Sequence, residues 1–261
     1  MGEQQQHFER LLSAHRRRLQ ALELQAASFG LLTPPHISTE IEDIRREIAA
    51  IEAQLPHSEQ VHNQKPGAGE VITILFLAAD PTDASRLRLG EELREIQEKL
   101  QIAKLRDHFR LEQRMSVRPA DLSQALLDIQ PQIVHFSGHG SATGALCLEN
   151  EIGGVHPIEP DALATLFEQF AGQISCVLLN ACYSEIQSRA ICRSIDYVIG
   201  MNQAIGDKAA IAFAIGFYQA LGGGRTIEDA YQLGCIQLRL QNIPEHLTPV
   251  LHKIGEVRLQ R

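Results

Sequence analysis

From residue 71 onward, short apolar runs alternate with longer amphipathic segments, and this alternation limits the folds open to the chain more than any other feature. Residues 71–79 form a nearly continuous apolar run, which is typical of a strand covered on both faces. Residues 87–100 then repeat leucine and isoleucine at helical spacing. Strands separated by helices predict an α/β fold, with a mostly parallel sheet and helices on both of its faces.

The same reasoning divides the rest of this region into further strands and helices. Thr226 and Asp229 have the spacing of a capping box and predict a helix to about Leu240. Asp207 is a good cap for a helix that ends near Leu221. We further expect strands over residues 108–114, 133–136, 174–179 and 197–200, part of a hairpin at 146–149, and helices over 119–129 and 161–170.

Residues 1–55 predict a separate hairpin of two helices. Apolar residues recur every three or four positions over 8–29 and again over 41–55. Two helices bury too little surface to be stable alone, so we expect this hairpin to dock on the rest of the chain, on a second copy or on another protein. Residues 56–70 are polar and turn-rich, which predicts a linker before a domain over 71–261.

Charge and composition argue against several classes of function. The 261 residues carry a formal net charge of −8, so there is no basic surplus to neutralise a nucleic-acid backbone. No run of roughly 18 apolar residues occurs, and the first residues have no apolar core of the signal-peptide type. The 5 cysteines, an odd number, fit a reducing compartment. We therefore expect a cytoplasmic protein that binds neither nucleic acid nor membranes.

A histidine and a cysteine follow two of the predicted buried strands. His139 lies in the run His-Phe-Ser-Gly-His-Gly, and Cys182 lies in Asn-Ala-Cys-Tyr-Ser. Parallel strands end at one edge of a sheet, where sites of such folds lie. An imidazole beside a thiol raises its thiolate fraction, which makes it a nucleophile. The backbone N–H groups of Gly140 and Cys182 are candidates to bind a developing oxyanion.

Several other polar residues have simpler interpretations. Buried cysteine is common, so we interpret Cys147, Cys176, Cys192 and Cys235 as packing residues. His135 lies inside its strand and is expected to be a packed, hydrogen-bonded histidine. A zinc site is a poor interpretation because the histidine pair lies on a strand and a glycine turn instead of one helical face. The predicted chemistry needs no metal and no organic cofactor.

The segments around His139 and Cys182 resemble the His-Gly and Ala-Cys motifs of caspase-like peptidases. More narrowly, residues 72–240 resemble the bacterial CHAT family, which is related to caspases and separase. The resemblance includes the sequence Ala79-Asp80-Pro81 and a helix over 209–221 with adjacent Phe and Tyr. It implies a caspase-hemoglobinase fold and a cysteine endopeptidase that cuts protein substrates, with His139 as the base and Cys182 as the nucleophile.

The resemblance also bears on substrate and partners. Some relatives have an acidic residue where this chain has Asn180, and separase recognises arginine through an aspartate in a context like that of Asp207. The plain alternative is that Asp207 only caps its helix. The N-terminal hairpin resembles helical modules of bacterial conflict and signalling effectors, which implies an activating sensor protein or a homo-oligomer in a defence or cell-death pathway. The alternatives are a catalytically silent scaffold that recruits partners through the hairpin and a peptide-ligating enzyme.

Overall fold

The computed structural model describes residues 71–257 and, before them, residues 18, 22, 34, 39, 40, 43, 44, 46 and 47. The chain divides into two compact units, residues 1–61 and residues 62–261. In the first unit the Nε of Arg18 donates to Oε1 of Glu40 at 3.1 Å, and both residues are helical. This contact joins residues of the two helices predicted there. The rest of the predicted hairpin and the linker lie outside the described residues.

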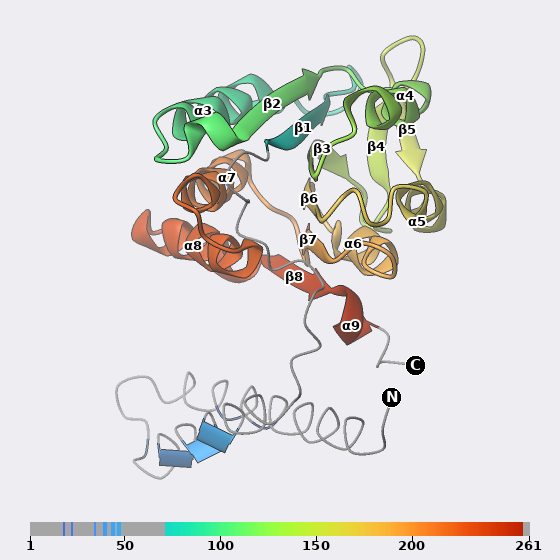
Figure 1. Ribbon diagram of the computed structural model, residues 1–261. Helices are drawn as coiled ribbons and strands as arrows, with labels where there is room; N and C mark the ends of the chain where they lie inside the picture. The colour runs from blue at the N-terminus through green and yellow to red at the C-terminus, as the bar shows by residue number, and fades with distance from the viewer. Residues whose placement is uncertain are drawn as a thin grey trace. The chain divides into compact units, whose positions relative to one another are not determined.

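The second unit is built on an eight-stranded sheet, which Figure 1 shows. Its main path runs in the order β2, β1, β3, β6, β7 and β8, and all these strands pair in parallel except β8, which is antiparallel to β7. The prediction of a mostly parallel sheet is therefore confirmed. The bounds are β1 Ile72–Ala79, β2 Phe109–Arg114, β3 Ile133–Gly140, β6 Cys176–Asn180, β7 Tyr197–Met201 and β8 Pro249–Lys253.

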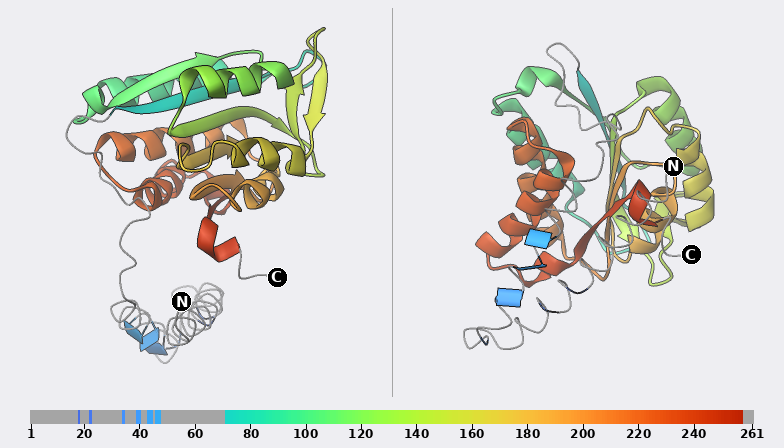
Figure 2. Two further views of the ribbon diagram at one scale, coloured as in Figure 1. Left: turned by 45° about the vertical axis from the view of Figure 1, so that its right-hand side comes forward. Right: turned by 60° about the horizontal axis from the view of Figure 1, so that its bottom comes forward.

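Helices cover both faces of this sheet (Figure 2). One face packs against α3 (Leu89–Gln101), α7 (Asp207–Gly222) and α8 (Ile227–Leu240), and the other against α4 (Pro119–Ile129), α5 (Pro160–Glu168) and α6 (Glu185–Ile191). Burial of both faces of β1 explains why its sequence is an unbroken apolar run. Its even-numbered residues, such as Phe76, join the first core, and its odd-numbered residues, such as Leu77, join the second.

Three features differ from the sequence-based expectations. Strand β3 extends to Gly140, beyond residue 136, because its end pairs with β4 (Leu146–Glu149), which forms a hairpin with β5 (Val155–Ile158). Helix α6 and strand β8 were not predicted, since each is short. The interpretation of Asp207 as a helix cap is wrong: Gly206 occupies the N-cap of α7, and no side chain caps it.

The other predicted elements match the structure closely. Thr226 caps α8 by accepting from the backbone N–H of Asp229 at 3.2 Å, as its spacing predicted. The short elements η2 (Arg106–His108), η3 (Pro244–Leu247) and α9 (Ile254–Val257) complete the unit. None of the helices in the described residues is long and apolar enough to cross a membrane. The parallel order brings the ends of β1, β3 and β6 to the same edge of the sheet.

Candidate active site

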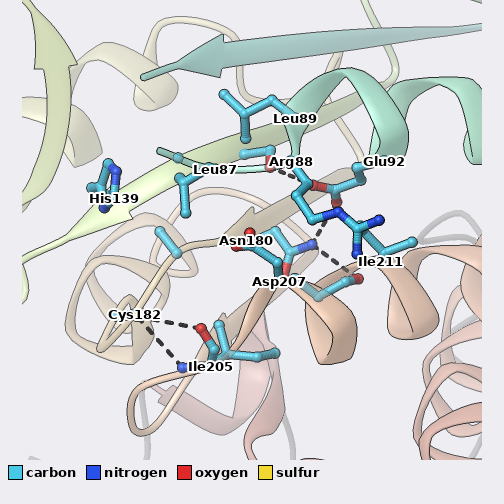
Figure 3. A pocket seen from close by; sticks show the side chains of 14 residues that line it. Leu87, Arg88, Leu89, Glu92, His139, Asn180, Cys182, Ile205, Asp207 and Ile211 are labelled. Carbon is cyan, nitrogen blue, oxygen red and sulfur yellow. Dashed lines mark hydrogen bonds between the residues drawn. The ribbon is translucent and has the colours of Figure 1, made fainter. Parts of the chain in front are cut away.

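A pocket lies at the edge of the sheet where these strands end (Figure 3). Four of the five residues singled out in the sequence line it: His139, Asn180, Cys182 and Asp207. The structure therefore brings together residues from the ends of β3 and β6 and from the start of α7. The pocket is completed by Leu87, Arg88, Leu89, Glu92, Ser137, Gly138, Ala181, Ile205, Ala210 and Ile211.

The fifth predicted residue, Gly140, packs directly against the backbone of Cys182. A Cβ atom on Gly140 would lie 1.9 Å from the carbonyl oxygen of Cys182 and 2.9 Å from its carbonyl carbon. No side chain fits there without displacing the backbone. The glycine thus allows the end of β3 to approach the turn that follows β6, and His139 is its immediate neighbour in the chain.

Cys182 lies on the turn between β6 and α6, and its side chain is half-buried. The backbone N–H of Ile205 donates to the Cys182 sulfur at 3.4 Å, and the sulfur contacts the Ile205 carbonyl at 3.6 Å. The next residue, Tyr183, has a φ of 56°, in the left-handed region that is uncommon for residues with a side chain. Its backbone N–H donates to the carbonyl of Gln203 at 3.2 Å, which anchors the turn.

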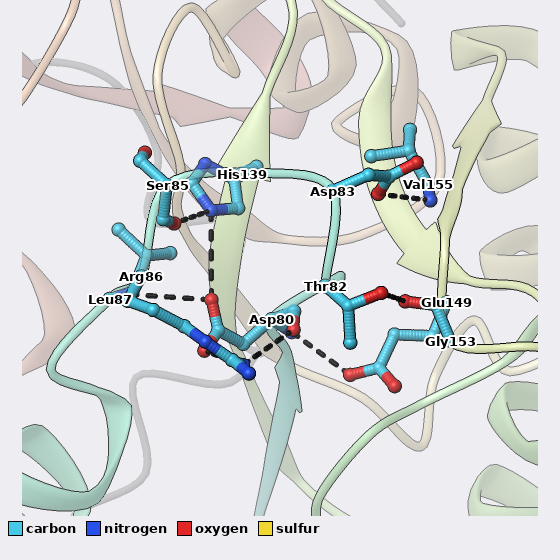
Figure 4. A network of polar contacts seen from close by, with 10 residues as sticks. All are labelled: Asp80, Thr82, Asp83, Ser85, Arg86, Leu87, His139, Glu149, Gly153 and Val155. Atoms are coloured by element: carbon cyan, nitrogen blue, oxygen red, sulfur yellow. Dashed lines mark hydrogen bonds and ion pairs between the residues drawn. The ribbon is translucent and has the colours of Figure 1, made fainter.

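The ring of His139 is oriented by the loop that connects β1 to α3 (Figure 4). Its Nε2 lies 2.7 Å from the carbonyl oxygen of Ser85 and 3.8 Å from Oδ1 of Asp80. A carbonyl oxygen can only accept, so Nε2 carries the hydrogen. In the neutral ring, Nδ1 is then the nitrogen that is able to take a proton.

That loop is itself held in place by hydrogen bonds at Asp80. The Asp80 carboxylate accepts from the backbone N–H of Leu87 at 3.3 Å and pairs with Arg86 at 3.0 Å. The backbone N–H of Asp80 donates to Oε1 of Glu149 in β4 at 3.0 Å. The β1–α3 loop is thereby attached to the β4–β5 hairpin. Sequence reasoning noted Asp80 only within a motif, and the carbonyl of Ser85 has no sequence signal because every residue has one.

A buried carboxylate that sequence reasoning missed, Glu92 of α3, lies behind the pocket. Its side chain is 3% exposed, and it accepts from the Ser137 hydroxyl and from Nδ2 of Asn180 at 2.5 Å. His135 Nε2 lies 3.0 Å from its Oε1. Burial would raise the pKa of Glu92, but the charge of His135 and the hydrogen bonds from these three side chains hold it below its ordinary value. The available signal was an acidic residue on the buried face of an amphipathic helix.

The surroundings of His135 and Asn180 define what each can do. His135 is fully buried, and its Nδ1 lies 3.1 Å from the hydroxyl of Tyr218, so the prediction of a packed histidine is confirmed. Asn180 is 3% exposed, and its Nδ2 also donates to the carbonyl of Ala210 at 3.2 Å. Within residues 71–257, its Oδ1 is buried without a hydrogen-bond partner.

The remaining cysteines differ from Cys182 in their surroundings. Cys147, Cys176 and Cys192 are buried, and Cys235 is half-buried. Burial raises the pKa of the thiols of Cys147 and Cys176, and it raises that of Cys235 to about 11. Such thiols are poor nucleophiles at neutral pH. In the part of the chain that the structure describes, no group of three or more His, Cys, Asp or Glu residues is arranged to hold a metal ion.

Comparisons with known proteins agree with this geometry. The family model described as CHAT domain matches residues 5–246. The chain is 29% identical over 178 residues to a Roc-COR-CHAT protease from an unknown prokaryotic organism, covering 66% of this chain and 17% of that protein. It is 26% identical over 160 residues to a probable protease of Gillisia limnaea, covering 60% of this chain and 28% of that protein. The chain therefore spans less than a third of the length of either relative.

A solved structure shows a similar fold at low sequence identity. The crystal structure of caspase-1 from Spodoptera frugiperda superposes with a TM-score of 0.50 and 12% identity, covering 75% of this chain and 92% of the caspase chain. At this identity the likeness concerns the fold alone. The sheet order, the edge at which the pocket lies and the family match lead to one conclusion: the chain belongs to the CHAT domain family and has a caspase-like fold.

Proposed function

We propose that the protein is a cysteine endopeptidase in which Cys182 is the nucleophile and His139 is the base. The observation that carries this proposal is the meeting of two strand ends at one pocket, where Gly140 packs against the backbone of Cys182. The two relatives, matched over 178 and 160 residues, are named as a protease and a probable protease, which supports the same chemistry.

In this mechanism Nδ1 of His139 takes the proton from the sulfur of Cys182. The thiolate forms a bond to the peptide carbonyl carbon, His139 protonates the leaving amine as the C–N bond breaks, and water then hydrolyses the thioester. The Ile205 N–H lies 3.4 Å from the sulfur and donates to it. The carboxylate of Asp80 lies 3.8 Å from Nε2, the nitrogen that keeps its hydrogen while Nδ1 takes the proton.

The backbone N–H groups of Gly140 and Cys182 are proposed to bind the oxyanion. Ser141 donates its N–H to Ala145 of the neighbouring strand at 2.9 Å. Because hydrogen-bonded and non-bonded pairs alternate in antiparallel pairing, the adjacent pair of Gly140 and Leu146 is non-bonded. The N–H of Gly140 then points away from β4. Within residues 71–257, no acceptor pairs with the N–H of Cys182.

We further propose that the pocket selects a basic side chain on the amino side of the cut bond. Asp207 lines the pocket, and among the described residues no cation pairs with its carboxylate. The one arginine of the lining, Arg88, pairs with Glu91 instead. Apolar walls from Leu87, Ile205 and Ile211 suit the long aliphatic part of arginine or lysine. Asn180 contributes to this selectivity from the pocket floor.

The N-terminal hairpin is proposed to recruit an activating protein or a second copy of the chain. This role rests on the resemblance of the hairpin to effector modules, together with a compact unit at residues 1–61 that is distinct from the caspase-like unit. The resemblance further supports a role in a bacterial defence or cell-death pathway.

A peptide-library cleavage assay tests the proposed activity. Wild-type protein, Cys182→Ala and His139→Ala are each incubated with the library, with and without proteins encoded by neighbouring genes, and the products are identified by mass spectrometry. We expect cleavage after arginine or lysine by the wild type alone. Equal product patterns from wild type and Cys182→Ala, together with partner binding through residues 1–61, would instead favour a catalytically silent scaffold. Joined peptides in place of cut ones would identify a ligase.

A further inference from the structure

We infer that Glu92 is a positioning residue that holds the strand ends carrying His139 and Cys182 in register. The inference rests on the proposed peptidase function and adds a residue to it. Glu92 reaches neither His139 nor Cys182 among its hydrogen-bond partners. It acts through the side chains that precede them on the two strands.

The contacts of Glu92 have a regular relation to the two strand ends. Ser137 lies two residues before His139, and Asn180 lies two residues before Cys182. Ser137 and Asn180 are also opposite each other in the pairing of β3 with β6, and that pairing ends with them. Beyond this point the two segments share no ladder hydrogen bonds. The Glu92 carboxylate binds both side chains of this last β3–β6 pair. Figure 3 shows its contact with Asn180.

Side-chain alternation places these residues on one face of the sheet. Residues two apart in a strand point to the same face, so Ser137 shares its face with His135, and the same face receives α3. Both donors therefore point at Glu92, one to each carboxylate oxygen. Movement of one strand end relative to the other would stretch or break one of these hydrogen bonds.

The chemistry of the site suits a carboxylate at position 92. Ser137, the Asn180 amide and His135 Nε2 all face it, and a carboxylate can accept from all of them. A glutamine could keep these contacts in one orientation alone, with its oxygen towards Asn180 and His135 and its N–H group donating to the Ser137 hydroxyl, and it would lack the charge. Because Glu92 is buried, a lost partner is not replaced readily by water, and this makes the arrangement rigid.

Glu92 also determines how Asn180 faces the pocket. The Asn180 Nδ2 donates both to Glu92 and to the carbonyl of Ala210, so its amide nitrogen is fixed by two acceptors from α3 and α7. The Asn180 Oδ1, buried without a partner among the described residues, is the acceptor left over. The carboxylate thereby sets the orientation of one of the residues proposed to select the substrate.

A double-mutant cycle tests the positioning role. Glu92→Gln, Asn180→Asp and the double variant are compared with the wild type by kcat, KM and the rate of Cys182 alkylation. Asn180→Asp places two carboxylates against each other, and we expect its kcat to fall by about tenfold to a hundredfold, with a smaller change in KM. Glu92→Gln removes the charge but can keep its hydrogen bonds, so we expect a smaller loss of kcat. In the double variant the amide at position 92 donates to the carboxylate at position 180, and part of the lost kcat returns.

The controls separate positioning from stability. Glu228→Gln is the matched control, because Glu228 is bonded to Tyr197 and Lys253 away from the pocket, and we expect its kcat to equal that of the wild type. All rates are measured where thermal melts show each variant to be folded. Ser137→Ala, which removes one donor and no charge, replaces Asn180→Asp should the latter fail to fold, and it should also lower kcat.

Two outcomes would overturn the inference. One is an unchanged kcat in folded Asn180→Asp or Ser137→Ala, and the other is strictly additive effects in the cycle. If the wild type shows no Cys182-dependent cleavage, the peptidase proposal fails, and the cycle is then judged on alkylation rates, which need no substrate. Non-additive effects on the alkylation rate would still support the positioning role. Identical alkylation rates in the wild type and all three variants would refute it.

Discussion

Gly140 and Cys182 approach so closely that a single added carbon on Gly140 would lie 1.9 Å from the Cys182 carbonyl oxygen. The contact joins the end of the strand that carries His139 to the turn that carries the thiol. It leaves room for no side chain at position 140. We propose that it also sets the relative position of the Gly140 and Cys182 backbone N–H groups.

Gly140→Ala should therefore abolish cleavage, because the added methyl group would displace the backbone N–H groups of Gly140 and Cys182 together. We expect kcat/KM to fall at least about a hundredfold, the effect typical of losing an oxyanion donor. Gly90→Ala is the matched control, because a Cβ there meets nothing within 4 Å. That variant should keep full activity and gain about 0.5 kcal/mol in its free energy of unfolding, measured by urea denaturation. Normal activity in Gly140→Ala would show that the close contact is not needed.

Asp80→Asn should reduce kcat while leaving the loop closed. Asparagine can still accept from the Leu87 N–H, but it no longer supplies a negative charge 3.8 Å from Nε2 of His139. We expect a loss of about tenfold in kcat with little change in KM. Asp128→Asn on α4 serves as the control and should behave as wild type, because among the described residues its side chain bonds only Gln124. Equal kcat in the two variants would exclude a role for the Asp80 charge.

Glu92 should make the stability of the protein depend on acid pH. Its pKa is lowered in the folded state from an ordinary value of 4.5, despite burial, by His135, Ser137 and Asn180. A lowered pKa contributes stability above the unfolded value, and this contribution is lost as pH falls through the folded pKa. Urea unfolding from pH 7 to pH 3 should show the wild type and Glu92→Gln converging below about pH 4.5. A difference that stays constant with pH would contradict a charged Glu92.

Asp207→Asn should change substrate preference more than it changes catalysis. The variant removes a pocket carboxylate that has no cationic partner among the described residues. With peptides that carry arginine before the cut bond, KM should rise about tenfold or more, because the guanidinium of the substrate loses the carboxylate that it pairs with in the wild type. Peptides with a neutral residue at the same place should be cut at an unchanged rate. A proportional loss for both peptides would assign Asp207 to folding instead of selectivity.

Much of the fold could be predicted because apolar periodicity reports burial directly. The run over 71–79 and the helical spacing of residues 87–100 correspond to β1 and α3 within two residues. Two short elements could not be predicted from the sequence. Helix α6 spans seven residues and strand β8 five, which is too few for a periodic pattern to be recognised. The extension of β3 to Gly140 depends on pairing with β4, which is a contact distant from the strand itself.

The sequence predicts those site residues whose type and position after a strand indicate their chemistry. It does not predict the residues that belong to the site through tertiary contacts alone. His139 and Cys182 follow strands, so their common edge follows from parallel order. Glu92 was hidden in an amphipathic helix, since acidic residues on helices usually face solvent. Ser85 contributes only a carbonyl oxygen, for which no side-chain pattern exists.

Covalent labelling of the thiols tests the central claim most directly. A peptidyl acyloxymethyl ketone with arginine beside the reactive group is added at pH 7.5 to the wild type and to His139→Ala, and the modified cysteine is located by peptide mapping. The account predicts a single adduct on Cys182, formed much more slowly in His139→Ala. Cys235, whose burial raises its pKa to about 11, should remain unmodified. Equal labelling of Cys182 and Cys235, or a Cys182 rate unaffected by His139→Ala, would contradict a Cys182–His139 catalytic pair.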